Sequence, residues 1–561
     1  MEKPKNGRWV DNPNARSFFC SLMSLLYALM IIVVAVVIEI SPTFKKRLYL
    51  GETIFHIWMY GIGTMFFVYC YVFMLNPGWF RYAQKLFYKI GWTNEDASWS
   101  LEKTSHTAEG AGSLYLRLGA MVFGMVGIVL LGIEVFLLIR DHNCYLSILQ
   151  YSLIIIFAFV QMHFIFCNSK MAIKTSKSLC KFGMMHNISV NIFTWLRFVI
   201  VKAASKHKKK QAKMIPVSSS SEEMERQITE GLTSVISSFY DIEATMNPLN
   251  ETLKPGKTLH AEEYFGDLTT FFVTCIVEYS LIGAAVMFIM WMSIDSTHLH
   301  HSTPQRVKRR SRMRIDCSRS STGLFGGIIF MILAFVSIGV YSVFDSMHDL
   351  SNSVLCFGII DLVMFVWVFL VCIFGIWKMR VLQYRKDHSH HSGEILDEIL
   401  LVIGLFGEIV YCCIAIDLWI TTQQTKDPMP GYELPVYISR LMAVFVQAVF
   451  IFISARLVAR GPDEIRQKPG KQAVTFLLVA NVTLFFFATY ESMKPTLPYD
   501  KSAAAFPYII YGVSPLVVFY RFHSSVCLVD IFKRTYNTKP SDMTSSTSMA
   551  TTTSTGASLE P

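Results

Sequence analysis

The stretch Gly266–Met292, GDLTTFFVTCIVEYSLIGAAVMFIMWM, decides how this chain folds. It is an apolar run long enough to cross a bilayer, since about 20 helical residues at roughly 1.5 Å each span the hydrocarbon. It carries one carboxyl group, Glu278, roughly 18 Å from its start. An ionised carboxylate at that depth costs at least a few kcal/mol unless water or a partner solvates it. Glu278 is therefore either a neutral packing group or a group that handles protons or ions.

The composition extends this interpretation to the whole chain. Of its 561 residues, 52% are hydrophobic and 16% are charged, whereas a soluble protein carries about 25% charged residues. The sequence predicts an all-α polytopic membrane protein, because lipid offers no partner to a backbone that is not helical. Twelve apolar segments are predicted to be transmembrane helices: 17–40, 51–75, 113–139, 145–167, 178–202, 266–292, 321–344, 352–377, 396–419, 434–457, 472–491 and 504–528.

Loop charge predicts the orientation. The formal net charge is +10, and the basic residues cluster beside apolar segments, which indicates contact with anionic lipid and not with nucleic acid. Basic connections follow spans 4, 6, 8 and 10, which predicts cytoplasmic N- and C-termini. Lys45–Arg47 and Lys206–Lys210 disagree with this pattern. The sequon at Asn250 predicts glycosylation and places the loop 203–265 outside.

The predicted organisation has five parts. Residues 1–16 form a cytoplasmic N-terminus, 17–292 a six-helix half with the external loop, and 293–320 a basic cytoplasmic linker. Residues 321–536 form the second six-helix half, and 537–561 a disordered Ser/Thr-rich cytoplasmic tail. No residue-level repeat relates the two halves.

Motifs for other chemistries are missing from the sequence. Most of the twelve cysteines lie inside spans, and there is no CxxC spacing, so neither a disulfide framework nor a zinc finger is predicted. There is no P-loop, GxGxxG, HExxH or potassium-channel filter. The histidines near 298–301 and 388–391 are better explained as solvated loop residues than as metal ligands. The sequence predicts no enzyme activity, no metal and no cofactor.

Polar residues inside the spans are the candidate functional groups. An isolated Gln or Asn can be hydrogen-bonding glue between helices, His186 can be interfacial, and Glu491 and Arg521 can extend toward a membrane surface. The number of such groups, with three carboxyls deep inside, instead favours a proton relay. Besides Glu278, the candidates are Glu134, Gln161, His186, Asn187, Asn191, Asp361, Glu408, Gln447, Asn481, Glu491, Tyr511, Arg521 and His523.

The chain resembles the otopetrin family from span 3 to the end, and six segments that carry the resemblance occur in the family's order. They are FAFVQMHFIFCNSK (Phe157–Lys170), KFGMMHNISVNIFTW (Lys181–Trp195), CIVEYSLIGAAVMFIMW (Cys275–Trp291), LDEILLV (Leu396–Val402), PGKQAVTFLLVAN (Pro469–Asn481) and FYRFHSSVCLVDIFKRTY (Phe519–Tyr536). The resemblance implies twelve helices in two halves, a homodimer, and a proton-selective channel of the plasma membrane that external acid opens. Membrane lipid, with a sterol as one candidate, is the other expected partner.

The resemblance also implies which polar residues matter. In the first half they match Glu134, Gln161, His186, Asn191 and Glu278, and in the second they match Gln447, Asn481, Glu491, Arg521 and His523. This chain departs from the family pattern at Ile453-Ser454, Phe485 and Tyr511. Because these departures lie in the second half, the first half is the predicted conduction route.

Three hypotheses remain open. In a proton channel, Glu278 would relay or gate, Glu134 would sense outer acid, and Gln161, His186 and Asn191 would orient water. A proton-coupled transporter would need broken helices around a solute site, and Gly512 and Pro515 offer one bend only. A non-conducting dimeric scaffold or modulator would explain the departures in the second half.

Overall fold

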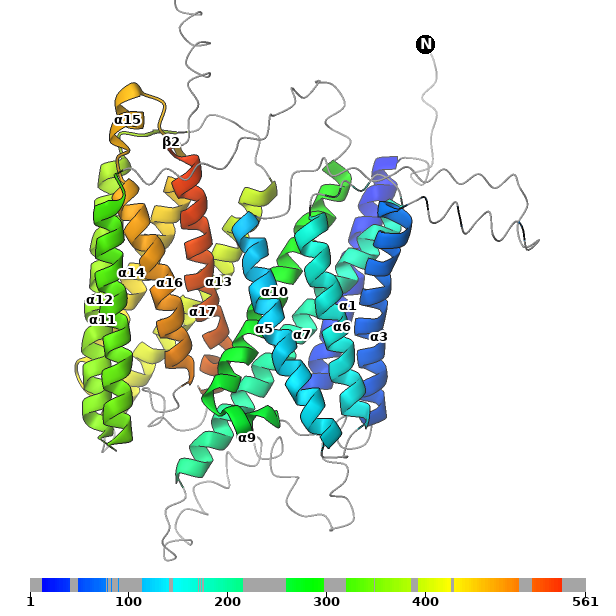
Figure 1. The fold of residues 1–561 in the computed structure, drawn as a ribbon, viewed down its shortest axis with the longest axis horizontal. Helices are drawn as coiled ribbons and strands as arrows, with labels where there is room; N and C mark the ends of the chain where they lie inside the picture. The colour runs from blue at the N-terminus through cyan, green and yellow to red at the C-terminus, as the bar shows by residue number, and fades with distance from the viewer. Residues whose placement is uncertain are drawn as a thin grey trace, which may run out of the picture.

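The computed structural model consists of long helices that run side by side (Figure 1). It describes residues 13–40, 49–76, 113–140, 145–169, 176–214, 259–296, 319–347, 349–384, 392–424, 428–493 and 507–536, with positions 78, 82, 89, 171 and 173. Asn250, both loop histidine clusters, most of the 203–265 connection and the 537–561 tail lie outside the described residues.

Twelve of the described helices are long and apolar enough to cross a membrane, which confirms the predicted fold class. In the first half they are α1 (Pro13–Ile40), α3 (Tyr49–Tyr69) with the π-helical η2 (Cys70–Leu75), α5 (Leu114–Arg140), α6 (Tyr145–Asn168), α7 (Lys177–Met214) and α10 (Asp267–Ser296). In the second half they are α11 (Ser321–Ser346), α12 (Leu350–Met379), α13 (Ser392–Thr422), α14 (Glu433–Ser454), α16 (Lys471–Met493) and α17 (Pro507–Arg534). The cytoplasmic placement of the termini stays a prediction.

The remaining described elements are short and lie at the ends of the bundle. Helix α9 (Ala261–Phe265) precedes α10 at one end. At the opposite end, strands β1 (Gln383–Tyr384) and β2 (Leu457–Val458) pair antiparallel, and helix α15 (Pro462–Gln467) follows (Figure 1). Helix α7 continues to Met214, past the predicted end of its span at residue 202.

Helix packing repeats in the two halves. In the first, α1 packs on α7, α3 on α6, α5 on both α6 and α10, and α7 on α10. In the second, α11 packs on α16, α12 on α14, α13 on both α14 and α17, and α16 on α17. Each of these contacts in the second half is made by the helices that lie six spans later in the chain than those of the corresponding contact in the first half. The structure therefore has an internal repeat that the residue letters do not reveal.

Helices α10 and α17 form the centre of the molecule. In their most apolar windows 72% and 78% of residues are buried, against 28% in α1 and in α11. Both contact the opposite half, since α10 packs against α13, α16 and α17, and α17 packs against α5 and α7. The stretch Gly266–Met292 thus belongs to the helix through which the first half meets the second.

A close approach between α11 and α16 depends on glycine. A Cβ atom at Gly323 would collide with the backbone oxygen of Gln472, and one at Gly327 would lie only 2.7 Å from Val479. Small residues four apart let two membrane helices come this close. Gly339, farther along α11, is not at a close contact, because a Cβ atom there would have no atom within 4 Å.

We expect Gly323→Ala to destabilise the second half by about 1–3 kcal/mol, because the added methyl forces α11 away from α16. Thermal unfolding of the purified protein in detergent measures this loss. The matched control is Gly339→Ala, which should leave the melting temperature unchanged or raise it slightly, because alanine favours the helix. Equal melting temperatures for the two variants would contradict the packing argument.

Candidate functional site

Glu278 is buried without a hydrogen bond. Its side chain on α10 is 1% exposed, and neither carboxylate oxygen has a partner among the described residues. The cation that interacts with it electrostatically is Lys202 of α7. Lys202 Nζ, however, donates to the hydroxyls of Thr274 (2.9 Å) and of Ser492 on α16 (3.4 Å). Since Thr274 and Glu278 are four residues apart on α10, the carboxyl lies on the face that meets α7 and the second half.

An amide pair joins α6 to α7 beside this helix. Gln161 Nε2 donates to Asn191 Oδ1 (2.9 Å), and Asn191 Nδ2 donates to Gln161 Oε1 (2.8 Å). The hydroxyl of Tyr279 on α10 accepts from Gln161 Nε2 (3.2 Å) and donates to the backbone oxygen of Ala158 (2.8 Å). Gln161, Asn191 and Tyr279 thus tie three helices together. The predicted candidates Gln161 and Asn191 are in direct contact.

A small cavity and an amide without hydrogen-bond partners lie beside the amide pair. A cavity of about 10 Å³, bordered by Asn191, Tyr279 and Gly127, is close to the size of one water molecule. Asn187, one helical turn from Asn191, is fully buried, and neither its Oδ1 nor its Nδ2 has a partner in the described part of the chain. These groups can bind and orient water.

His186 lies in a separate cluster. Its Nε2 donates to the backbone oxygen of Met59 on α3 (2.9 Å). In a neutral imidazole Nδ1 then accepts from the hydroxyl of Tyr27 on α1, 3.1 Å away. The ring is 1% exposed, so it is buried among helices. The structure therefore brings together Gln161 and Asn191 and places His186 on another side of α7.

Glu134 caps a helix at the end of the bundle that carries α9. One carboxylate oxygen accepts from the backbone N–H and the Nδ1 of His260 (both 2.9 Å), and the other accepts from the backbone N–H of Ala261 (3.0 Å). Both N–H groups begin α9, where a negative charge stabilises the helix dipole. The Glu134 side chain is 1% exposed and the His260 side chain 40% exposed, so the pair links the interior to solvent.

A second ionic cluster lies near the same end, and the sequence alone did not predict it. Arg197 Nη1 on α7 donates to Glu39 of α1 and to Glu52 of α3, each at 2.9 Å. Glu39, Glu52 and His56 have ligand atoms within 4.8 Å of one another, as a metal site would require. The guanidinium of Arg197 already supplies the positive charge there. An arginine inside an apolar segment was the signal that could have found this cluster.

The second half repeats the amide frame of the first. Gln447 Nε2 on α14 donates to Asn481 Oδ1 on α16 (2.9 Å), and Asn481 Nδ2 donates in return (3.2 Å). The Tyr520 hydroxyl of α17 donates to the backbone oxygen of Val444 (3.0 Å), three residues before Gln447, just as Tyr279 donates three residues before Gln161. Two of the predicted candidates, Gln447 and Asn481, are therefore equivalent to the pair in the first half.

The buried glutamates of the second half are ion-paired. Arg440 Nε donates to Glu408 (3.1 Å), and Arg440 Nη1 donates to both carboxylate oxygens of Glu491 (3.1 Å each). Arg521 forms an ion pair with Glu408, and its side chain is only 1% exposed, so it does not extend to a membrane surface. Asp361 is buried and interacts electrostatically with the same cluster. Arg440, which sequence reasoning missed, holds the cluster together.

His523 lies farther along α17 than the Arg440 cluster, nearer the end of the bundle that carries α15. Its Nε2 donates to the backbone oxygen of Asp397 (2.9 Å), and its ring stacks on Phe519 at 5.5 Å. Tyr511 belongs to α17, but its side chain lies outside the described part of the structure.

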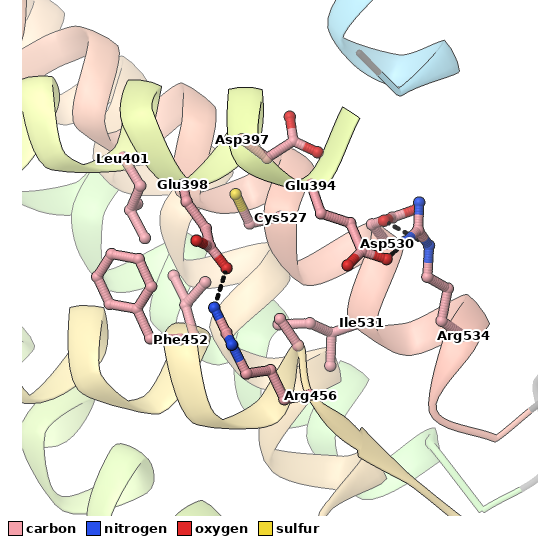
Figure 2. Close-up of a pocket in the computed structure, with 12 residues that line it drawn as sticks. Glu394, Asp397, Glu398, Leu401, Phe452, Arg456, Cys527, Asp530, Ile531 and Arg534 are labelled. Carbon is pink, nitrogen blue, oxygen red and sulfur yellow. Dashed lines mark hydrogen bonds and ion pairs between the residues drawn. The ribbon is translucent and has the colours of Figure 1, made fainter. Parts of the chain in front are cut away.

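A cavity of about 50 Å³ opens beside Asp397 between α13, α14 and α17 (Figure 2). Arg456 Nη2 pairs with Glu398 (2.8 Å), and Arg534 pairs with Asp530 (2.8 Å) and with Glu394. Glu394, Glu398 and Asp530 are thus paired with cations at this cavity, and the space is large enough for water-sized molecules.

Comparison with known proteins gives consistent matches. A family model described as Otopetrin matches residues 115–522, well over half of the chain. Proton channel OtopLc of Drosophila melanogaster is 29% identical over 488 residues, which are 77% of this chain and 28% of the fly protein. Proton channel OTOP1 of Rattus norvegicus is 23% identical over 367 residues (64% and 55%), and Proton channel OTOP2 of Mus musculus 22% over 407 residues (69% and 65%). The chain spans less than two thirds of each relative.

We expect Arg440→Met to destabilise the protein by roughly 3–5 kcal/mol, because it leaves Glu408 and Glu491 buried beside a single remaining arginine. Arg456→Met is the matched control: its ion pair with Glu398 is about one third exposed and should cost at most about 1 kcal/mol. Melting temperatures in detergent compare the two. An Arg440 variant as stable as the Arg456 variant would show that the cluster does not hold the second half together.

Proposed function

Because this chain belongs to the otopetrin family, we propose that it is a proton-selective ion channel that conducts H⁺ across the plasma membrane and opens when the external side is acidified. The family resemblance found in the sequence is confirmed. The relatives it matches are named proton channels, which are not enzymes. Because the chain spans only part of each relative, the proposed activity rests on the geometry of the site as well as on the family.

The observation that carries the proposal is the unpaired carboxyl of Glu278. A buried carboxylate without hydrogen bonds is costly, so it must bind either a proton or water. Lys202 lies close enough to Glu278 to interact with it electrostatically, but its hydrogen bonds go to Thr274 and Ser492. Glu278 is therefore free to accept a proton from one side and to release it to the other.

Selectivity follows from how the proton travels. Protons pass along short chains of water and side chains, whereas a metal cation must keep or replace a whole hydration shell. The cavity beside Asn191 has room for about one water, which is too little for a hydrated sodium or potassium ion. Asn191 and Tyr279 border this cavity and can orient such a water, and Gln161 holds both side chains through its hydrogen bonds.

We place the route in the first half because Glu278 makes no hydrogen bond to the described residues, whereas the buried glutamates of the second half are ion-paired. In the second half Glu408 and Glu491 are held by Arg440 and Arg521, and a fixed guanidinium repels a passing proton. Protonating either glutamate there would also break an ion pair. This argument agrees with the second-half departures from the family pattern. It also leaves the second half a structural or regulatory role.

Glu134 is the proposed outer acid sensor. As a carboxylate, Glu134 accepts hydrogen bonds from two backbone N–H groups at the start of α9 and from the imidazole N–H of His260. Protonation of Glu134 would remove the negative charge that favours this helix start. Acid would thereby loosen α9 from α5, next to the start of α10. The homodimer and the sterol partner stay predictions.

We expect Glu278→Gln to abolish acid-driven proton flux, because an amide cannot bind and release a proton as a carboxyl does. The measurement is dye-reported flux into liposomes that contain the purified protein, with sodium and potassium omitted. The matched control is Asp361→Asn, the same change at a buried carboxyl of the second half, which should keep most of the flux.

Three results would contradict this proposal in different ways. Normal flux from the Glu278 variant would remove that residue from the path. Loss of flux in the Asp361 variant alone would move the path to the second half. No flux from the unaltered protein would favour the non-conducting member of the family, and flux that requires a co-transported solute would favour the transporter.

We expect Glu134→Gln to shift activation toward neutral pH, because the amide lacks the charge that holds α9 in place and so mimics the acid-exposed state. Whole-cell recording during stepwise external acidification measures the threshold. Glu263→Gln, an exposed position on the same short helix, should leave the threshold where it is. A Glu134 variant with an unchanged threshold would exclude the helix cap as the sensor.

A further inference from the structure

A basic cavity of about 330 Å³ lies at the end of the second half that carries α15, away from every group in the proposed proton path. It is formed by the residues just before α11, by the last turn of α12 and by the connection from α15 to α16. Its charged lining residues are all cations: Arg319, Lys378, Arg380 and Lys468. Among the described residues that line it, none is acidic.

The aromatic side chain of Trp377 indicates that this cavity lies at a membrane surface. Lys378 Nζ lies 4.7 Å from the ring centroid of Trp377, and Arg380 Cζ lies 5.1 Å from it. Trp377 is 49% exposed at the end of a membrane-spanning helix, a position where tryptophan marks the boundary between hydrocarbon and water. The cations are therefore held at the depth of phospholipid headgroups.

The backbone adds to the positive potential. Gly470 adopts a positive φ of 80° and turns the chain into α16, whose first turn contributes Gln472 to the cavity wall. The N-terminus of this helix carries a partial positive charge, which favours phosphate. The close packing of α11 on α16 at Gly323 brings Arg319 to the same wall.

We propose that this cavity binds the headgroup of an anionic phospholipid, with the acyl chains lying along the exposed face of α12. The four cations match a polyanionic headgroup, and a basic pocket between membrane helices is a known form of such a site. A lipid fits better than free phosphate because Phe374 and Leu370 continue an exposed apolar surface away from the cavity. This inference does not depend on conduction.

Native mass spectrometry of the purified full-length chain tests the site, with a phosphatidylinositol bisphosphate and with phosphatidylcholine as probes. The unaltered protein should prefer the polyanionic lipid. Lys378→Gln with Lys468→Gln should bind it roughly thirtyfold more weakly, because each basic residue near a lipid surface contributes about fivefold. The matched control removes two exposed charges at the same end, Arg460→Gln with Arg466→Gln, and should bind as the unaltered protein does.

Three outcomes would overturn the proposal. These are equal binding of the two lipids, full binding by the Lys378/Lys468 variant, and equally tight binding of soluble inositol trisphosphate, which would make a lipid unnecessary. If the Lys378/Lys468 double variant elutes as an aggregate in size-exclusion chromatography, the single variant Arg380→Gln is tested instead. It should bind the polyanionic lipid about fivefold more weakly, and unchanged binding would overturn the proposal.

Discussion

Hydrocarbon offers no hydrogen-bond partner, so a polar side chain on one span must find its partner on another span. The reciprocal amide pairs of this protein satisfy that constraint, Gln161 with Asn191 and Gln447 with Asn481. In each half a tyrosine then fastens a third helix to the helix that carries the glutamine. Each pair fixes the position of one helix against another, so the packing pattern of the first half recurs in the second.

On this shared frame the two halves carry different charges. The second half neutralises its buried glutamates with Arg440 and Arg521. The first half leaves Glu278 without a bonded cation. A buried ion pair adds little net stability but is costly to break, whereas protonating an unpaired carboxyl breaks no ion pair. The same pattern of helix packing therefore contains ion-paired glutamates in one half and an unpaired carboxyl, our proposed proton-binding group, in the other.

The boundary between the halves links these two roles. Glu278 lies on α10, one of the two most buried spans, and the amine beside it reaches Ser492 of the opposite half. The electrostatic environment of the carboxyl thus depends on both halves, even though we place conduction in one of them. At the periphery, Glu134 pairs with the partly exposed His260 at one end of the bundle, and the basic cavity near Trp377 lies at the other end.

The sequence by itself determined the twelve spans, because apolar length is a local property, and it located most of the polar groups inside them. Six short segments also identified the family. Only the tertiary structure decided which groups meet: that Arg440 lies between Glu408 and Glu491, that Glu134 caps α9, and that the halves repeat. These partners come from helices far apart in the chain. Their contacts depend on helix rotation and spacing, which the order of residues along one span does not specify.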